Sequence, residues 1–207
     1  MFDALRSRPI RLSLLIILSV LGSGDLAAQE VRPRAVVASF QDTLLSTMKE
    51  AESLGFKGRY QRLLPAMEKA FDLEQMTRIV TGGNWTRMNR TDQMQVVDLF
   101  RQFSVSTYAS AFSGYSGEQF EVGKELAQPG IGTIVETRLV LKSEPPIKLN
   151  YLLQDTPAGW KIMDVYLDGT ISELARRRGE FASIIHNQGL TGLIALLRKK
   201  NKELAGG

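Results

Sequence analysis

Residues 159–181 read GWKIMDVYLDGTISELARRRGEF, and they join a predicted amphipathic strand to a predicted amphipathic helix through one short turn. The segment from Trp160 contains few strand breakers, and Asp168-Gly169 is a turn dipeptide. Thr170 and Glu173 have the spacing of a capping box, which predicts that the helix begins at Thr170. An apolar stripe follows at helical spacing. A sheet that ends in a helix folding back on it can make a groove.

The first 28 residues have the layout of a secretory signal peptide. Three arginines precede an apolar run at residues 12–21, and small residues lead to Ala28. The run is half of the roughly 20 apolar residues that a membrane-spanning helix needs. We therefore expect export, with residues 1–28 removed and residues 29–207 forming one domain. An uncleaved membrane anchor is the alternative.

The composition describes an exported globular domain of modest charge. The chain has 207 residues, a formal net charge of +4 and no cysteine. So small an excess of positive charge does not indicate nucleic-acid binding. Without cysteines, the domain needs no disulfide machinery and must be stabilised by its core.

Helical periodicity comes first along the chain, strand alternation follows, and helices return at the end. The predicted strands are residues 118–124, 133–141, 147–154 and 160–167, and the predicted helices include residues 36–54, one that begins at Pro65, one capped by Asp72, one at residues 91–114 and two separated by Gly189. Short links between the strands predict a meander. The expected architecture is α+β: a curved antiparallel four-stranded meander sheet, with helices from both ends of the chain packed on one side.

Candidate catalytic groups are scarce. The only histidine, His186, lies near the predicted end of a helix, where a cation suits the macrodipole. The chain contains no carboxylate or histidine motif with metal-ligand spacing, no nucleophile elbow and no phosphate-binding glycine loop. We therefore expect a protein that is not an enzyme, with no catalytic residue, metal site or cofactor.

Two sets of charged residues have more than one interpretation. Asp164 interrupts an apolar strand, and an acceptor for loop amides or an arginine is favoured over a ligand role. Basic clusters stand at residues 176–178 and 198–200. Such runs are usually solvated faces, although they can also contact anionic lipid headgroups or an acidic partner.

Several motifs resemble those of one known family. The sharpest are Phe71-Asp72 with Gly83-x-Trp85, Thr107-Tyr108-Ala109, and Trp160-Lys161-Ile162 followed by Asp164-Val165. Over about residues 36–202, the chain resembles the periplasmic lipid-binding family once called toluene-tolerance proteins. The best-known branch of that family is the soluble shuttle of the outer-membrane lipid-asymmetry pathway. Residues 167–175, LDGTISELA, depart from this phospholipid branch and resemble the branch associated with hopanoid biosynthesis.

The resemblance implies a soluble periplasmic carrier that holds a membrane lipid, hopanoid or phospholipid, in an apolar cavity between sheet and helices. Its partners would be an inner-membrane transporter and an outer-membrane acceptor complex. We chose candidate cavity residues by face and size, because the family motif does not mark them. The expected sheet wall is Val135, Thr137, Leu139, Leu149, Tyr151, Met163 and Val165, and the expected helical wall is Phe71, Met76, Val96, Phe100, Phe103 and Tyr108.

The rival interpretation is a periplasmic adaptor that binds protein partners of membrane transport without carrying lipid. Residues 176–178 and the C-terminal helix would then form its docking face.

Overall fold

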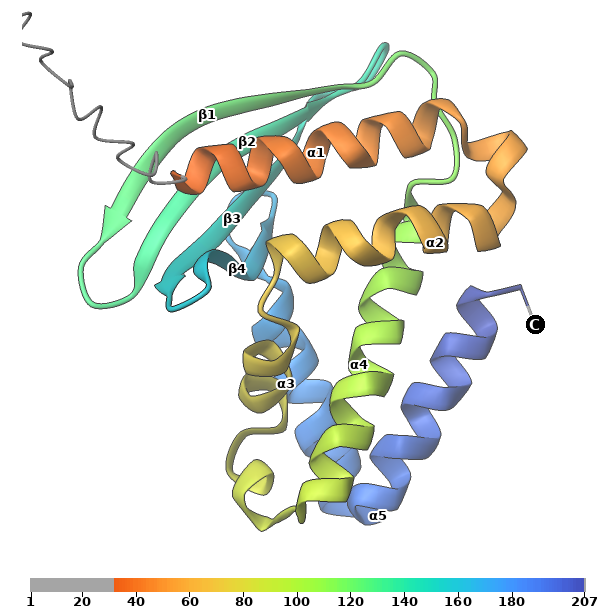
Figure 1. Cartoon of the computed structure of the whole chain (residues 1–207), viewed down its shortest axis with the longest axis vertical. Helices are drawn as coiled ribbons and strands as arrows, with labels where there is room; N and C mark the ends of the chain where they lie inside the picture. The colour runs from red at the N-terminus through yellow and green to blue at the C-terminus, as the bar shows by residue number, and fades with distance from the viewer. Residues whose placement is uncertain (1–31, 207) are drawn as a thin grey trace, which may run out of the picture. The chain divides into compact units, whose positions relative to one another are not determined.

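The computed structural model describes residues 32–206, and the predicted signal peptide at residues 1–28 lies outside this range. Helices come first, a sheet follows and a long helix closes the chain (Figure 1). The elements are α1 (Pro33–Lys49), α2 (Ala51–Ala70), α3 (Leu73–Thr81), the 3-10 helix η1 (Gly82–Arg87), α4 (Arg90–Ala111), β1 (Gln119–Gln128), β2 (Gly132–Val140), β3 (Ile147–Thr156), β4 (Gly159–Leu167), β5 (Ile171–Ser172) and α5 (Glu173–Leu204).

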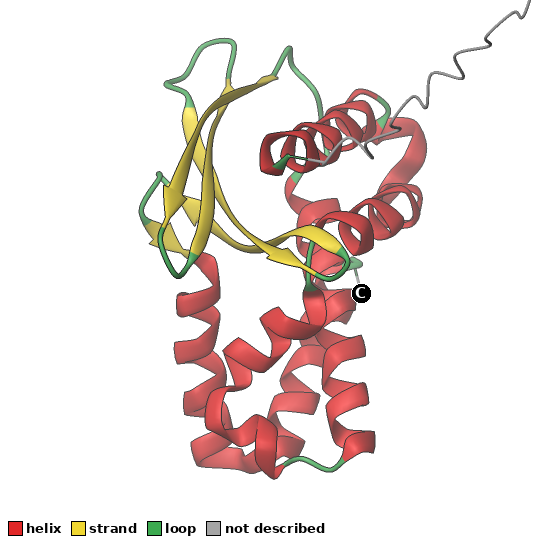
Figure 2. Cartoon of the chain, turned by 60° about the vertical axis from the view of Figure 1, so that its left-hand side comes forward, coloured by secondary structure: helices red, strands yellow, loops and turns green. Residues whose placement is uncertain are grey.

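The strands form an antiparallel sheet in the order β1-β2-β3-β4-β5. The sheet is curved, and α1 packs against it (Figures 1 and 2). The predicted α+β meander is therefore confirmed, with one more strand than the four expected. Asp168 and Gly169 both have positive φ, 51° and 80°, so the chain reverses within one tight turn and β5 pairs with the end of β4.

Because of the extra strand, the last helix begins later than the sequence predicts. Ser172 is the N-cap of α5, and its hydroxyl accepts from the Ala175 amide at 2.8 Å. The prediction that Thr170 caps this helix is wrong, because Thr170 belongs to the turn before β5.

The predicted helix start at Pro65 is also wrong. Pro65 lies inside α2, and the break in that helix falls earlier, at Gly55, where φ is 57° and ψ is −174°. Glycine adopts this conformation without the steric cost of a Cβ.

A lysine of the sheet binds the end of α2. The C-terminal carbonyls of α2 accept from Lys161 of β4, whose Nζ donates to Glu68 O at 3.3 Å and also to Lys69 O. This contact holds α2 to the sheet.

Two other predicted helix boundaries are confirmed. The Asp72 carboxylate caps α3 by accepting from the Gln75 amide at 2.9 Å. Gly189 has φ 68° and ψ −170° and divides α5 into two helical segments. The break lets the chain change direction, and α5 packs against both α3 and α4 (Figure 1).

A β-bulge at Met163 changes the faces of β4. Asp164 and Ile162 pair with consecutive residues of β3, so Met163 has no partner in the ladder. Ile162 and Val165 both pair with inward-facing residues of β3 and therefore share the inner face. Simple alternation puts Ile162 with Asp164 and Met163 with Val165, and the bulge makes this assignment wrong.

The core lies between the inner face of the sheet and the helices. Its fully buried members include Phe40 and Leu44 of α1, Leu63 and Met67 of α2, Tyr151 and Leu153 of β3, Ile162 of β4, and Phe181, Leu193 and Leu197 of α5. Among residues 32–206, no helix combines the length and apolar character needed to cross a bilayer.

Candidate functional site

A cavity of about 360 Å³ lies between α4, the strands β3 and β4, and the first turn of α5. Such a volume is near the lower end of the roughly 300–1,000 Å³ typical of small-molecule sites. Most lining side chains are hydrophobic, and the charged ones come from β4 and the start of α5. The lining residues are Met67, Phe71, Met76, Phe100, Phe103, Ser104, Thr107, Tyr108, Ala111, Phe112, Leu149, Tyr151, Asp164, Val165, Leu167, Glu173, Leu174, Arg176 and Arg177.

One wall is a stripe along the C-terminal half of α4. Phe100, Phe103, Thr107 and Ala111 recur three or four residues apart, so their side chains share one face of the helix. The Thr107 hydroxyl donates to its own helix, to Phe103 O at 2.8 Å. The polar atom of Thr107 is therefore satisfied, and its methyl group contributes to the apolar wall.

The opposite wall comes from two paired strands. Leu149 pairs with Leu167, and Tyr151 pairs with Val165. Directly paired residues point to the same face of a sheet. Four side chains thus present a continuous surface to α4, and all four line the cavity.

Aromatic rings pack around the inner end of the cavity. Phe40 of α1 lies edge-on to Phe71 and Tyr108, with ring centroids 5.0 and 5.4 Å apart, and Tyr108 stacks on Phe112 at 5.7 Å. Such aromatic contacts stabilise the fold by more than the burial of their apolar surface alone does. The rings connect α1 and α4 with Phe71, the residue that follows α2.

The tyrosine hydroxyls in this region stay neutral at physiological pH. Burial raises the pKa of Tyr151 to about 12, and burial also raises the pKa of Tyr108 well above its usual value. Behind them, Gln41 Nε2 donates to Thr137 Oγ1 at 3.0 Å. The inner end of the cavity therefore carries no charge from these groups.

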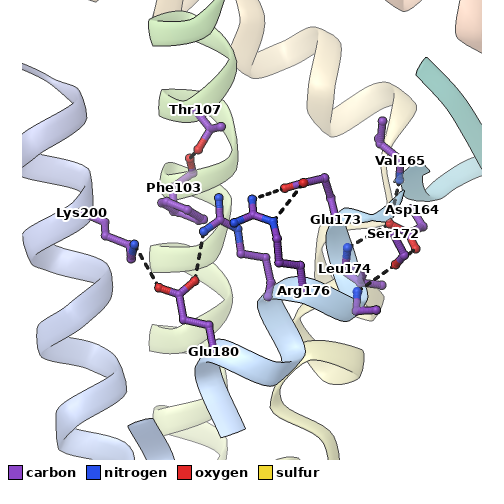
Figure 3. Close-up of polar contacts among 12 residues, drawn as sticks. Phe103, Thr107, Asp164, Val165, Ser172, Glu173, Leu174, Arg176, Glu180 and Lys200 are labelled. Carbon is purple, nitrogen blue, oxygen red and sulfur yellow. Dashed lines mark hydrogen bonds and ion pairs between the residues drawn. The ribbon is translucent and has the colours of Figure 1, made fainter. Parts of the chain in front are cut away.

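Asp164 fixes the start of α5 beside the cavity (Figure 3). Its Oδ1 accepts from the amides of Val165 and Leu174 at 2.8 and 3.0 Å, and its Oδ2 accepts from the Ser172 hydroxyl. Burial raises the pKa of Asp164, although the three donors oppose this shift. The predicted acceptor role is confirmed, but the donors are amides of β4 and α5 and a hydroxyl of β5 rather than loop amides or an arginine. The carboxylate thus holds β4, β5 and α5 together.

Charged side chains gather where the first turn of α5 meets the cavity (Figure 3). Arg176 Nε donates to Glu173 Oε1 at 3.1 Å, and its Nη2 binds the other oxygen of the same carboxylate. Arg177 Nη1 and Lys200 Nζ both bind Glu180, at 3.1 and 3.0 Å. Burial opposes ionisation of Glu180, but these two cations more than compensate and lower its pKa. The side chain of Arg176 is 53 % exposed, so this edge of the lining reaches solvent.

The structure brings eight of the thirteen predicted cavity residues together. Phe71, Met76, Phe100, Phe103, Tyr108, Leu149, Tyr151 and Val165 line the cavity. The other five are also buried but lie outside the lining, and they are Val96, Val135, Thr137, Leu139 and Met163. Met163 stands at the bulge, and Thr137 bonds to Gln41 and Leu149 O. A buried inward-facing residue can either fill the core or line a cavity, and periodicity does not distinguish the two.

The lining also contains residues that the sequence prediction omitted. Thr107 and Ala111 belong to the α4 stripe, and Phe112 directly follows α4, four residues after Tyr108, so helical spacing was a sufficient signal for them. Arg176 and Arg177 belong to the basic cluster that the sequence marks at residues 176–178, but no local pattern places them at a cavity, because the fold of α5 against β4 brings them there. Within the described part of the chain, no group of three or more histidine, aspartate or glutamate side chains is placed to hold a metal ion.

The fold and the cavity define an α+β protein in which a curved antiparallel sheet and several helices surround a largely apolar cavity. The chain belongs to the MlaC family, because residues 38–199 match the family described as "MlaC protein". The family membership expected from the sequence is therefore confirmed.

A solved structure has the same fold. It is a phospholipid-binding protein from Ralstonia solanacearum in complex with a phospholipid, and the match covers 84 % of this chain and 98 % of that chain. The TM-score is 0.75 and the sequence identity is 24 %. No curated protein matches the chain.

Proposed function

We propose that this protein is a periplasmic carrier that holds the apolar part of a membrane lipid in its cavity and shuttles the lipid between the inner and outer membranes. The observation that carries the proposal is the cavity of about 360 Å³, lined on two walls by hydrophobic side chains and open beside Arg176. Membership of the MlaC family and the phospholipid bound to the Ralstonia protein support it.

The physical need for a carrier follows from the hydrophobic effect. Each exposed methylene group costs about 0.8 kcal/mol, so an acyl chain of about 16 carbons costs roughly 13 kcal/mol in water. A protein that covers even half of this surface makes passage between membranes much faster. The phenylalanines and methionines of the lining suit such a guest, because Met adapts its shape to irregular apolar surfaces.

Two cargoes fit the proposal. A phospholipid is supported by the ligand of the Ralstonia protein. A hopanoid, which is rigid and polycyclic, is supported by residues 167–175, which resemble the hopanoid-associated branch. These residues form the turn, β5 and the beginning of α5, directly beside the cavity opening.

The proposal includes partners at both membranes, an inner-membrane transporter and an outer-membrane acceptor. The alternative is an adaptor that docks through residues 176–178 and the basic C-terminal helix without carrying lipid. Several of these charges are paired within the protein, including Arg176 with Glu173 and Lys200 with Glu180. An adaptor would leave the apolar cavity without a role, and we therefore favour the carrier.

Lipid extraction and mass spectrometry of protein purified from periplasm test the proposal. We expect one lipid class in near-stoichiometric amount, and its identity decides between phospholipid and hopanoid. A transfer assay then follows labelled lipid between donor and acceptor vesicles with and without the protein. Recovery of no lipid, together with no acceleration of transfer, would overturn the carrier and favour the adaptor.

A further inference from the structure

Two arginine side chains lie at an edge of the apolar cavity, where Arg176 reaches solvent. Arg176 and Arg177 are consecutive residues of the first turns of α5, and both line the cavity. We propose that these two guanidinium groups form a binding site for a phosphate oxyanion, the anionic headgroup of a lipid whose apolar part occupies the cavity. Glu173 and Glu180 bind these guanidinium groups, and a phosphate would compete with them for the same donors. This inference rests on the proposed lipid-carrier function and names the headgroup chemistry that it selects.

Arg177 is held in place but has hydrogen-bonding capacity to spare. Its guanidinium lies over the ring of Phe103, 4.6 Å from the centroid, and its side chain is only 15 % exposed. The contact with an aromatic face restricts the orientation of the guanidinium. Within the described residues, only Nη1 of Arg177 makes an ion pair, with Glu180. Nε and Nη2 are therefore available to a ligand that enters beside Phe103.

Arg176 shows which ligand geometry the site accepts. Glu173 binds it through both carboxylate oxygens, one to Nε and one to Nη2. Two parallel N–H donors that hold two oxygens of one anion match a phosphate as well as a carboxylate. Arg176 is half-exposed while Glu173 is 26 % exposed, so this pair stands where the cavity meets solvent.

The charged cluster lies close to the N-terminus of α5, where Arg176 and Arg177 are the fourth and fifth residues of the helix. The N-terminus of a helix carries a partial positive charge, which stabilises anions and destabilises cations in the first turn. Glu173 and Glu180 offset the two arginines, but Lys200 adds a third cation that shares Glu180. The cluster of Arg176, Arg177, Lys200, Glu173 and Glu180 therefore retains one excess positive charge, which an anionic ligand would neutralise.

The remaining carboxylate of the lining does not compete for the arginines. Asp164 accepts from the Ser172 hydroxyl and from two main-chain amides, so its acceptor sites face β4 and the start of α5 (Figure 3). The guanidinium groups and the apolar walls thus meet at one edge of the cavity. An apolar compartment with cations at its opening is complementary to an amphiphile with an anionic head.

Paired ligands separate headgroup recognition from tail binding. Lipid-free protein is titrated with dioctanoyl phosphatidylglycerol and with dioctanoylglycerol, which has the same chains but no phosphate, and native mass spectrometry measures both affinities. The double variant R176Q/R177Q should bind the phospholipid about 10- to 100-fold more weakly, equivalent to about 1.4–2.8 kcal/mol. Its affinity for dioctanoylglycerol should not change. The matched control is R178Q, because the Arg178 guanidinium lies beside Gly82 at the end of α3 and not in the cavity lining.

A second variant gives a change in the opposite direction, which a folding defect would not produce. E173Q removes the carboxylate that occupies Arg176, and we expect phospholipid affinity to rise severalfold. Equal phospholipid binding by the native protein and R176Q/R177Q would overturn the headgroup site, and so would an equal loss of both ligands. If the native protein binds neither ligand, the carrier function itself fails.

A third titration, with inorganic phosphate, identifies the source of the anion. We expect free phosphate to compete with the phospholipid only at millimolar concentration. Competition at the phospholipid's own concentration would overturn the lipid assignment and leave a free-phosphate site.

Discussion

Filling the cavity from within is the most direct perturbation of the proposed function. Thr107 stands in the middle of the α4 stripe, and its only side-chain hydrogen bond among the described residues is to its own helix. Replacing it with tryptophan, T107W, breaks no side-chain hydrogen bond between the described elements. The indole ring should therefore occupy the cavity without removing a tertiary hydrogen bond.

The magnitude follows from the cavity volume. Tryptophan exceeds threonine by roughly 110 Å³ at the packing density of a protein interior, which is close to a third of the 360 Å³ available. That volume corresponds to about four methylene groups of a bound lipid, and at about 0.8 kcal/mol each the loss is about 3 kcal/mol. We expect lipid affinity to fall roughly 150-fold.

The assay is titration of lipid-free protein with phospholipid, together with the transfer assay between vesicles. The control is M94W, since Met94 lies on the same helix but is 59 % exposed and does not line the cavity. Circular dichroism at rising temperature should show that T107W remains folded. If folded T107W binds and transfers phospholipid as well as M94W does, the cavity is not the lipid site.

Two further predictions concern stability. Arg59 is buried and donates to two main-chain carbonyls, Ala109 O at 2.8 Å and Ala51 O at 2.9 Å. The variant R59M should therefore lower the free energy of unfolding, measured in urea, by about 3 kcal/mol. A loss below about 1 kcal/mol would contradict this role. The pKa of Asp164 is raised above 3.8 by burial, so the folded state binds this proton more tightly than the unfolded chain does. The stability that this group contributes is present below pH 3.8 and is lost as pH rises through the raised pKa. The melting temperature of the native protein should therefore fall relative to that of D164N as pH rises from 3.8 towards neutrality, and a constant difference would refute the assignment.

Part of the site could be predicted from the sequence because its residues follow simple periods. Phe100, Phe103 and Tyr108 recur at helical spacing, and Leu149 with Tyr151 alternates along a strand. All five line the cavity. The same patterns also select Val96 and Val135, which are fully buried but lie outside the lining. A period identifies the inward face of an element, and it does not say whether another side chain fills the space opposite.

Other errors came from local geometry that has no clear signature in the sequence. The bulge at Met163 reverses the alternation within β4, and no glycine or proline marks it. Thr170 and Ser172 both suit a helix cap, and pairing of β5 with β4 selects Ser172. Pro65 suits a helix start, but the break at Gly55 already begins that segment. In the first two cases, pairing between β4 and a neighbouring strand decides the local geometry.

The amino-acid sequence by itself determined the order of helices and strands, the α+β class, the family, and the role of Asp164 as an acceptor. These properties depend on hydrophobic period, caps and motifs, which act over a few residues. Only the tertiary structure decided which buried residues face empty space and that Arg176 and Arg177 stand at the cavity opening. The reason is that a cavity exists only where packed elements lie too far apart for their side chains to fill the space between them. The packing of α5 against β4 and α4 sets that distance and also brings the charged turn to the end of an apolar chamber.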